Sequence, residues 1–200
     1  MSAGGIRPEA AASAPLSGWM EEVRRRLAAR PRADPREEPN LRRAGVLVPL
    51  FVRDARLWVL FTRRTESVEH HRGQISFPGG AHEPEDESLY ATALRETEEE
   101  LAVAPADVVS LGSLSPITTV TSFYVEPFVA ALPQPYIWRP EEAEIAEIIE
   151  APVAELMDPA ILETRTIPGR EGTILFSPDG AHVSWGATAR MLSELLEALR

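Results

Sequence analysis

The sequence predicts an α/β fold in which strands are flanked by helices, arranged as an α/β sandwich. Short apolar runs separated by turn residues indicate strands, and three longer stretches with apolar residues every three or four positions indicate helices. A length of 200 residues with 44% hydrophobic content is sufficient for one compact domain with a sizeable core. The chain shows no internal repeat of solenoid period.

The N-terminal part of the chain predicts one helix between two irregular stretches. Ser17 is placed to cap a helix that runs to about Ala29, with an apolar stripe formed by Trp19, Met20, Val23 and Leu27. Three prolines make residues 30–40 an irregular connector. The predicted layout is a single domain over residues 1–200, with a flexible end (1–16), an N-terminal helix and connector (17–43) and a core (44–200).

The middle of the chain alternates between strand and helix patterns. Strand patterns cover residues 44–51, 57–62, 75–77, 108–114, 124–132 and 144–149, and the last of these also fits a short helix. Residues 87–101 predict a helix whose apolar side faces the core while its glutamates project elsewhere. The residues expected on that apolar side are Leu89, Tyr90, Ala93, Leu94, Thr97 and Leu101.

The C-terminal part predicts small strands between two helices. Pro152 is expected at an early position of a short helix that ends before Asp158. Short strands are expected at residues 164–167, 173–176 and 182–185, separated by turns at Gly169 and at Asp179-Gly180. Residues 186–199 predict a final amphipathic helix.

Composition excludes several classes of function. The absence of cysteine rules out disulfides, thiolate catalysis and a cysteine zinc site, and is compatible with the reducing cytoplasm, where we expect the protein. No apolar run is long enough for a membrane span, and the N-terminus lacks a hydrophobic signal core, so we expect a soluble protein without membrane partners. A formal net charge of −11 disfavours binding to nucleic acid.

Three carboxylates share one face of the central predicted helix. At about 100° per residue, Glu96, Glu99 and Glu100 fall within roughly a quarter turn. Such a cluster suits hard divalent cations, and Mg²⁺ or Mn²⁺ typically combines a few carboxylates with water and substrate phosphates. The same run also fits a solvated acidic helix face.

The residues around this cluster resemble the Nudix box. In that motif a glycine is followed after five residues by an acid, and after seven more by Arg-Glu-apolar-any-Glu-Glu-any-Gly-apolar. Gly80 and Asp86 match its beginning, although eight residues rather than seven separate Asp86 from Arg95. Alternatively Glu87 restores the seven-residue gap, but Ala81 then stands in the glycine position. The end of the motif is matched by Arg95, Glu96, Glu99, Glu100 and Val103.

Two further positions depart from the motif, and the upstream residues narrow the resemblance. Thr97 occupies an apolar position, and Ala102 replaces the last glycine. Residues 60–65 (Leu-Phe-Thr-Arg-Arg-Thr) and 71–80 (His-Arg-Gly-Gln-Ile-Ser-Phe-Pro-Gly-Gly) look like the signature of the coenzyme A pyrophosphatase branch of Nudix hydrolases, which also tends to carry the extra residue. In place of one arginine of that signature, this chain has Glu69.

The resemblance implies an α/β/α sandwich with a mixed sheet between helices. It also implies metal-dependent hydrolysis of a pyrophosphate bond. The substrate would be coenzyme A or its thioesters, and the products phosphopantetheine, or its acyl form, and adenosine 3′,5′-bisphosphate. The alternatives are another nucleoside diphosphate derivative such as NADH or ADP-ribose, or a catalytically silent binding module. In each case we expect a small-molecule nucleotide partner.

Candidate roles can be assigned to the residues of the motif. Glu96, Glu99 and Glu100 are the predicted metal ligands, whose cations would neutralise phosphate oxygens and lower the pKa of a bound water. Arg95, four residues before Glu99, is predicted to orient the carboxylates. Glu99 or Glu144 is the candidate base. The predicted substrate-binding residues are Arg63, Arg64, His71, Arg72, Gly79 and Gly80, of which the two glycines also allow close approach to the metal site.

Overall fold

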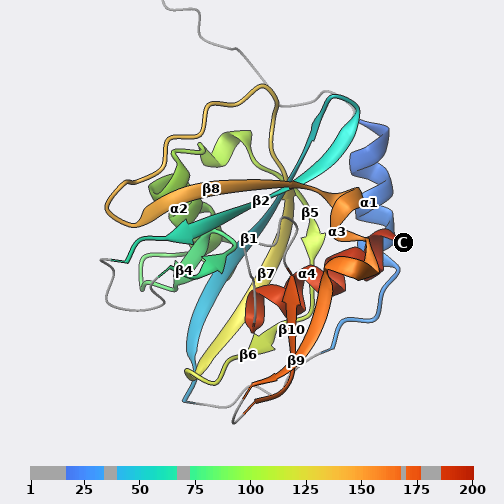
Figure 1. The fold of residues 1–200 in the computed structure, drawn as a ribbon. Coiled ribbons are helices and arrows are strands. Elements are labelled where there is room, and N and C mark those ends of the chain that lie inside the picture. Colours follow the sequence, from blue (N-terminus) through green and yellow to red (C-terminus); the bar gives the residue numbers. More distant parts are fainter. Residues whose placement is uncertain (1–16, 34–39, 67–72, 168–169, 177–185) are drawn as a thin grey trace, which may run out of the picture.

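The computed structural model shows a mixed β-sheet between helices (Figure 1). It describes residues 17–33, 40–66, 73–167, 170–176 and 186–200. Among these residues, no helix is long and apolar enough to cross a membrane.

The main sheet has eight strands, with the path β3-β2-β1-β7-β5; β4 pairs with β1, β6 with β7 and β8 with β2. Only the β1–β7 pair is parallel among the pairs of described strands, and the other pairs are antiparallel. The strands are β1 (Arg42–Arg53), β2 (Arg56–Arg64), β3 (Ile75–Ser76), β4 (Gly79–Ala81), β5 (Val109–Ser113), β6 (Ile117–Thr118), β7 (Phe123–Ala131) and β8 (Ile145–Pro152). A separate antiparallel pair consists of β9 (Leu162–Ile167) and β10 (Arg170–Phe176).

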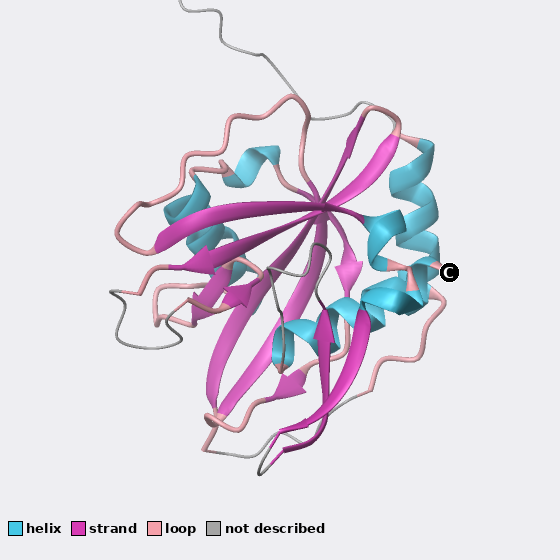
Figure 2. Cartoon of the chain, viewed as in Figure 1, coloured by secondary structure: helices cyan, strands magenta, loops and turns pink. Residues whose placement is uncertain are grey.

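Helices cover both faces of the main sheet (Figure 2). Side chains alternate along β1, so Leu47 packs with Ala93 of α2 on one face, and Val48 packs into the core shared with α1 and α4 on the other. The α-helices are α1 (Gly18–Ala28), α2 (Leu89–Leu101), α3 (Val153–Leu156) and α4 (Ala187–Leu199), and the short 3₁₀ helices are η1 (Pro105–Asp107) and η2 (Pro159–Ile161). The layers form the predicted α/β/α sandwich.

The predicted elements are present with shifted ends. The stretch 144–149, which also fitted a helix, belongs to strand β8, and Pro152 precedes the first residue of α3. Ser17 stands at the N-cap of α1, as predicted, but its side chain makes no capping bond. Its backbone carbonyl accepts from Met20 N instead. The predicted strand 182–185 and the turns at Gly169 and Asp179-Gly180 lie outside the described residues, and the single-domain layout stays a prediction.

Helix α2 is fixed against β1 by a glycine contact. A Cβ on Gly45 would overlap the carbonyl oxygen of Leu89 and crowd the amide of Ala93, so the helix backbone lies directly on the strand. The helix begins after Ser88, whose hydroxyl accepts from Ala91 N at 3.1 Å, and ends at Ala102 in the left-handed conformation with φ 55°. This close packing of α2 on β1 determines where the α2 side chains lie relative to β4.

Candidate active site

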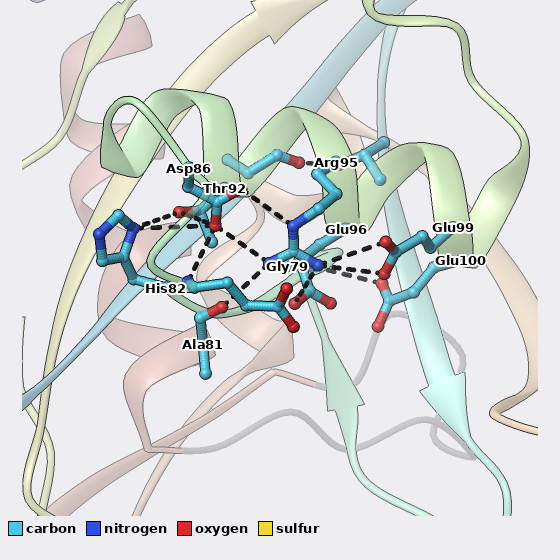
Figure 3. Close-up of polar contacts among 12 residues, drawn as sticks. Gly79, Ala81, His82, Asp86, Thr92, Arg95, Glu96, Glu99 and Glu100 are labelled. Atoms are coloured by element: carbon cyan, nitrogen blue, oxygen red, sulfur yellow. Dashed lines mark hydrogen bonds and ion pairs between the residues drawn. The ribbon is translucent and has the colours of Figure 1, made fainter.

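The site is organised around the guanidinium of Arg95, which projects from α2 (Figure 3). Its Nε and Nη2 donate to the two carboxylate oxygens of Asp86 at 3.0 and 3.1 Å, and Nη2 also donates to the carbonyl of Ala81 at 3.1 Å. The Asp86 side chain is only 6% exposed. Such a bidentate, nearly buried pair fixes the plane of the guanidinium.

Asp86 is held by further donors from the loop before α2. The amide of Glu83 donates to Asp86 Oδ2 at 3.0 Å, and the hydroxyl of Thr92 donates to the same oxygen at 2.8 Å. His82 Nδ1 lies 3.0 Å from the Thr92 hydroxyl (Figure 3). The bond to Arg95 is the main cause that holds the pKa of Asp86 well below its usual range. Asp86 is therefore a carboxylate over the whole physiological pH range.

The ambiguity between two neighbouring acids is resolved by this geometry. Asp86 faces Arg95, whereas Glu87 is exposed to solvent. Asp86 thus occupies the first acidic position of the motif, with eight residues between it and Arg95. Thr92 is a partner that the sequence argument missed, although it precedes Arg95 by three positions and so shares its side of the helix.

The remaining donor of Arg95 faces the predicted metal ligands. Nη1 lies 3.1 Å from a carboxylate oxygen of Glu96 and 3.2 Å from one of Glu99. The Glu99 side chain is 59% exposed and that of Glu96 is 19% exposed. Arg95 therefore links Asp86 to two of the three glutamates, in a position suited to the orienting role that was predicted for it.

Glu100 corrects the expectation that the helix glutamates project away from the core. Its side chain is only 5% exposed, and Gly79 N donates to its Oε2 at 3.3 Å. Burial, together with the nearby charges of Glu96 and Glu144, raises the pKa of Glu100 to about 8. The physical reason for its inward direction is its helical position, seven residues after the buried Ala93 and next to the buried Leu101.

Arg64, at the end of β2, bridges two acids. Its Nη1 lies 3.3 Å from Glu100 Oε1, and its Nη2 lies 3.0 Å from Glu144 Oε2. The structure thus brings Glu144 to the acids of α2, as its candidacy as a base requires. Arg64, predicted to bind substrate, is paired with protein carboxylates in this structure.

The other predicted substrate-binding residues are distributed differently. Arg63 points to β8, where its Nε donates to Glu147 Oε2 at 2.8 Å, so the two adjacent arginines serve different acids. His71 and Arg72 lie outside the described residues, as does Glu69. Gly79 has φ 145°, a value that favours glycine, and a Cβ on Gly80 would overlap the carboxylate of Glu96. The close approach predicted for this glycine pair is therefore made by Gly80 to a predicted metal ligand.

The donor chemistry of the α2 acids fits a divalent cation. Burial is the main cause that raises the pKa of Glu96, and the charge of the neighbouring Glu99 adds to it. A bound cation relieves this repulsion. Within the described residues, no group of three or more His, Cys, Asp or Glu side chains is arranged to hold a metal ion. Arg95 and Arg64 pair with the α2 carboxylates in this structure.

A cavity of about 360 Å³ lies beside the first turn of α2, and His82, which contacts Thr92, is part of its lining. Its lining comes from β1, β7 and the start of the helix and includes Arg43, Tyr90 and Phe128. None of the predicted site residues is in this lining.

Comparison with known proteins gives consistent matches. Residues 41–169 match the family model described as NUDIX domain. A protein of Salmonella paratyphi B named "Uncharacterized Nudix hydrolase NudL" is 37% identical over 161 residues, which cover 80% of this chain and 83% of that protein. A protein of the same name from Salmonella newport matches with the same identity and coverage.

Solved structures share the fold. A Nudix hydrolase from Alicyclobacillus acidocaldarius superposes with a TM-score of 0.52 at 16% identity, covering 80% of this chain and 93% of that one. A protein from Deinococcus radiodurans gives a TM-score of 0.50 at 17% identity, covering 80% of this chain and 88% of that one. These likenesses confirm the predicted fold class, and they concern the fold alone.

Proposed function

This chain belongs to the Nudix hydrolase family, and from that premise we propose that it hydrolyses the pyrophosphate bond of coenzyme A or its thioesters. The products would be phosphopantetheine, or acyl-phosphopantetheine, and adenosine 3′,5′-bisphosphate. The reaction would require Mg²⁺ or Mn²⁺. A nucleoside diphosphate derivative is the broader substrate class within which coenzyme A is the specific proposal.

The observation that carries the hydrolase proposal is the buried carboxylate of Glu100 beside Glu96. A silent binding module has no need for a buried acid whose charged form is disfavoured by burial, whereas a metal-dependent enzyme can use this carboxyl group to hold its cation. The choice of coenzyme A is supported by the sequence of residues 60–65 and 71–80, which looks like the signature of that branch.

Each residue of the site has a proposed task. Glu96, Glu99 and Glu100 would hold the divalent cation, which when bound neutralises phosphate oxygens and lowers the pKa of a coordinated water. Asp86 fixes Arg95, and Arg95 keeps Glu96 and Glu99 oriented. Glu99 or Glu144 would accept the proton of the attacking water, because both are exposed enough to meet it.

The test is product analysis by mass spectrometry across a panel of coenzyme A, acetyl-coenzyme A, dephospho-coenzyme A, NADH and ADP-ribose with Mg²⁺. Dephospho-coenzyme A lacks only the phosphate on the adenosine ribose. A charge-assisted hydrogen bond to that phosphate contributes roughly 1.5 to 3 kcal/mol, so we expect kcat/KM to fall at least about tenfold for dephospho-coenzyme A and further for NADH.

Two controls test the metal-dependent hydrolase activity separately from the choice of coenzyme A as substrate. Excess chelator should abolish turnover of every substrate, and full activity in chelator would contradict the metal requirement. If NADH or ADP-ribose is the best substrate, the coenzyme A proposal is wrong and the hydrolase proposal stands.

A further inference from the structure

Arg64 connects two acids that come from different parts of the chain. Glu100 belongs to α2, and Glu144 precedes β8. The guanidinium reaches both, at 3.3 and 3.0 Å, and is 24% exposed. A single cation is therefore shared between a carboxylate in the interior and one at the surface.

The backbone around this bridge is fixed by hydrogen bonds. The amide of Thr65 donates to the carbonyl of Glu144 at 2.8 Å, and the hydroxyl of Thr65 donates to the carbonyl of Ala143 at 3.0 Å. The amide of Glu141 donates to the carbonyl of Glu100 at 3.0 Å. The end of β2, the segment before β8 and the end of α2 are thus tied together, which holds the bridging side chains in reach of one another.

The carboxylate of Glu100 has a partner on each oxygen. Oε2 accepts from the amide of Gly79, and Oε1 pairs with Arg64. The Gly79 donor is part of β4 and cannot leave without disrupting the β1–β4 pairing, whereas Arg64 is a long side chain with a second acid to hold it. A cation that binds Glu100 therefore meets Arg64 as its competitor.

We propose that Arg64 is the resident counter-cation of Glu100, which a divalent cation displaces when it binds, while the pair with Glu144 keeps the guanidinium at the edge of the site. This inference rests on the metal requirement of the proposed function. In the metal-free protein Arg64 supplies the positive charge beside the buried Glu100 side chain; after displacement its freed donors would be available to an anionic substrate. Arg64 is thus a positioning residue that links metal loading to the acid pair.

The experiment compares Arg64→Gln with Arg63→Gln in the full chain. Arg63 is the adjacent residue of β2, and its ion pair with Glu147 makes Arg63→Gln a matched control for the loss of one arginine. Mn²⁺ binding is measured by electron paramagnetic resonance, without substrate, and thermal unfolding is measured in chelator.

We expect Arg64→Gln to bind Mn²⁺ about tenfold more tightly than the wild type, because one opposing positive charge has been removed. The same variant should unfold at a lower temperature in chelator, and adding Glu100→Gln to it should restore part of that loss. Arg63→Gln should leave the Mn²⁺ affinity unchanged. If Arg64→Gln does not fold, Arg64→Lys provides the test: lysine lacks the planar two-nitrogen fork through which Arg64 reaches both carboxylates, so its hold on Glu100 should be weaker and this variant should also bind Mn²⁺ more tightly.

Unchanged or weaker Mn²⁺ binding by the Arg64 variants overturns the inference. A wild-type protein that binds no Mn²⁺ overturns it together with the metal requirement. If the Arg64 variants bind Mn²⁺ more tightly but the wild type hydrolyses none of the panel substrates, the inference stands and the proposed activity fails.

Discussion

At the scale of single residues, the carboxylate of Asp86 is held from α2 by the guanidinium of Arg95 and the hydroxyl of Thr92. Asp86 and Glu87 are adjacent, and either could begin the motif, because the sequence does not fix the turn before the helix. The structure identifies Asp86 as the first acid of the motif, because Arg95 and Thr92 of α2 both donate to its carboxylate. The inward position of Glu100 could have been predicted, since it continues the helical spacing of the core residues on the same face.

The first residue-scale prediction concerns the Asp86–Arg95 pair. Asp86→Asn removes the charge that two guanidinium donors share, and we expect unfolding free energy to fall by about 2 to 3 kcal/mol in urea denaturation at pH 7. Glu87→Gln is the control: it changes the adjacent, exposed acid and should have no measurable effect.

The pH dependence of the Asp86→Asn effect follows from the sign of the pKa shift. Arg95 lowers the folded-state pKa of Asp86, so its stabilisation is fully present above the unfolded value, near 3.8, and is lost as the pH falls toward the folded-state pKa. The difference between wild type and Asp86→Asn should shrink below about pH 4. A difference that stays constant from pH 7 to pH 3 would contradict this assignment.

At the scale of elements, periodicity predicted which segments are strands and helices, and packing decided their ends. Strand β1 extends past the predicted limit at residue 51 to Arg53, because the hairpin with β2 continues through the Arg53–Arg56 pair. Helix α2 begins at Leu89 rather than at residue 87, because Ser88 caps it. The contacts that position α2 were not predictable, since Gly45 is distant in sequence from the helix that lies on it.

The element-scale prediction tests the close packing of α2 on Gly45 of β1. Gly45→Ala places a methyl group against the backbone of Leu89 and Ala93, which cannot move aside as a side chain would. We expect a loss of about 1 to 3 kcal/mol in unfolding free energy and a lower kcat, because displacement of α2 shifts the acids it carries. Gly18→Ala is the matched control, since an added Cβ at Gly18 meets no atom within 4 Å. Equal stability of the two variants would show that α2 tolerates the shift.

At the scale of the whole molecule, one face of the sheet carries the acids of the candidate site and the other face is covered by α1 and α4. Helix α2 carries the acids on one face, and α1 and α4 cover the other and contact each other through Arg26, whose Nη1 donates to the carbonyl of Leu199 at 2.9 Å. The family match over residues 41–169 includes α2 but neither α1 nor α4. The sequence predicted both helices from their amphipathic patterns, but their contact depends on the fold, which brings α1 and α4 together.

This division predicts that stability and catalysis can be separated by a core substitution far from the acids. Leu27 of α1 is 5% exposed and packs beside Gly112 of β5, where a Cβ would lie 3.4 Å from its side chain. Leu27→Ala should lower the unfolding free energy by about 2 to 5 kcal/mol, measured by urea denaturation, because a cavity remains under the helix. Arg25→Ala is the control on the exposed side of α1 and should change stability little, since its pair with Glu22 lies at the surface. At temperatures where Leu27→Ala remains folded, its kcat/KM should match the wild type; a loss of activity in the folded variant would show that the α1 face communicates with the acid site.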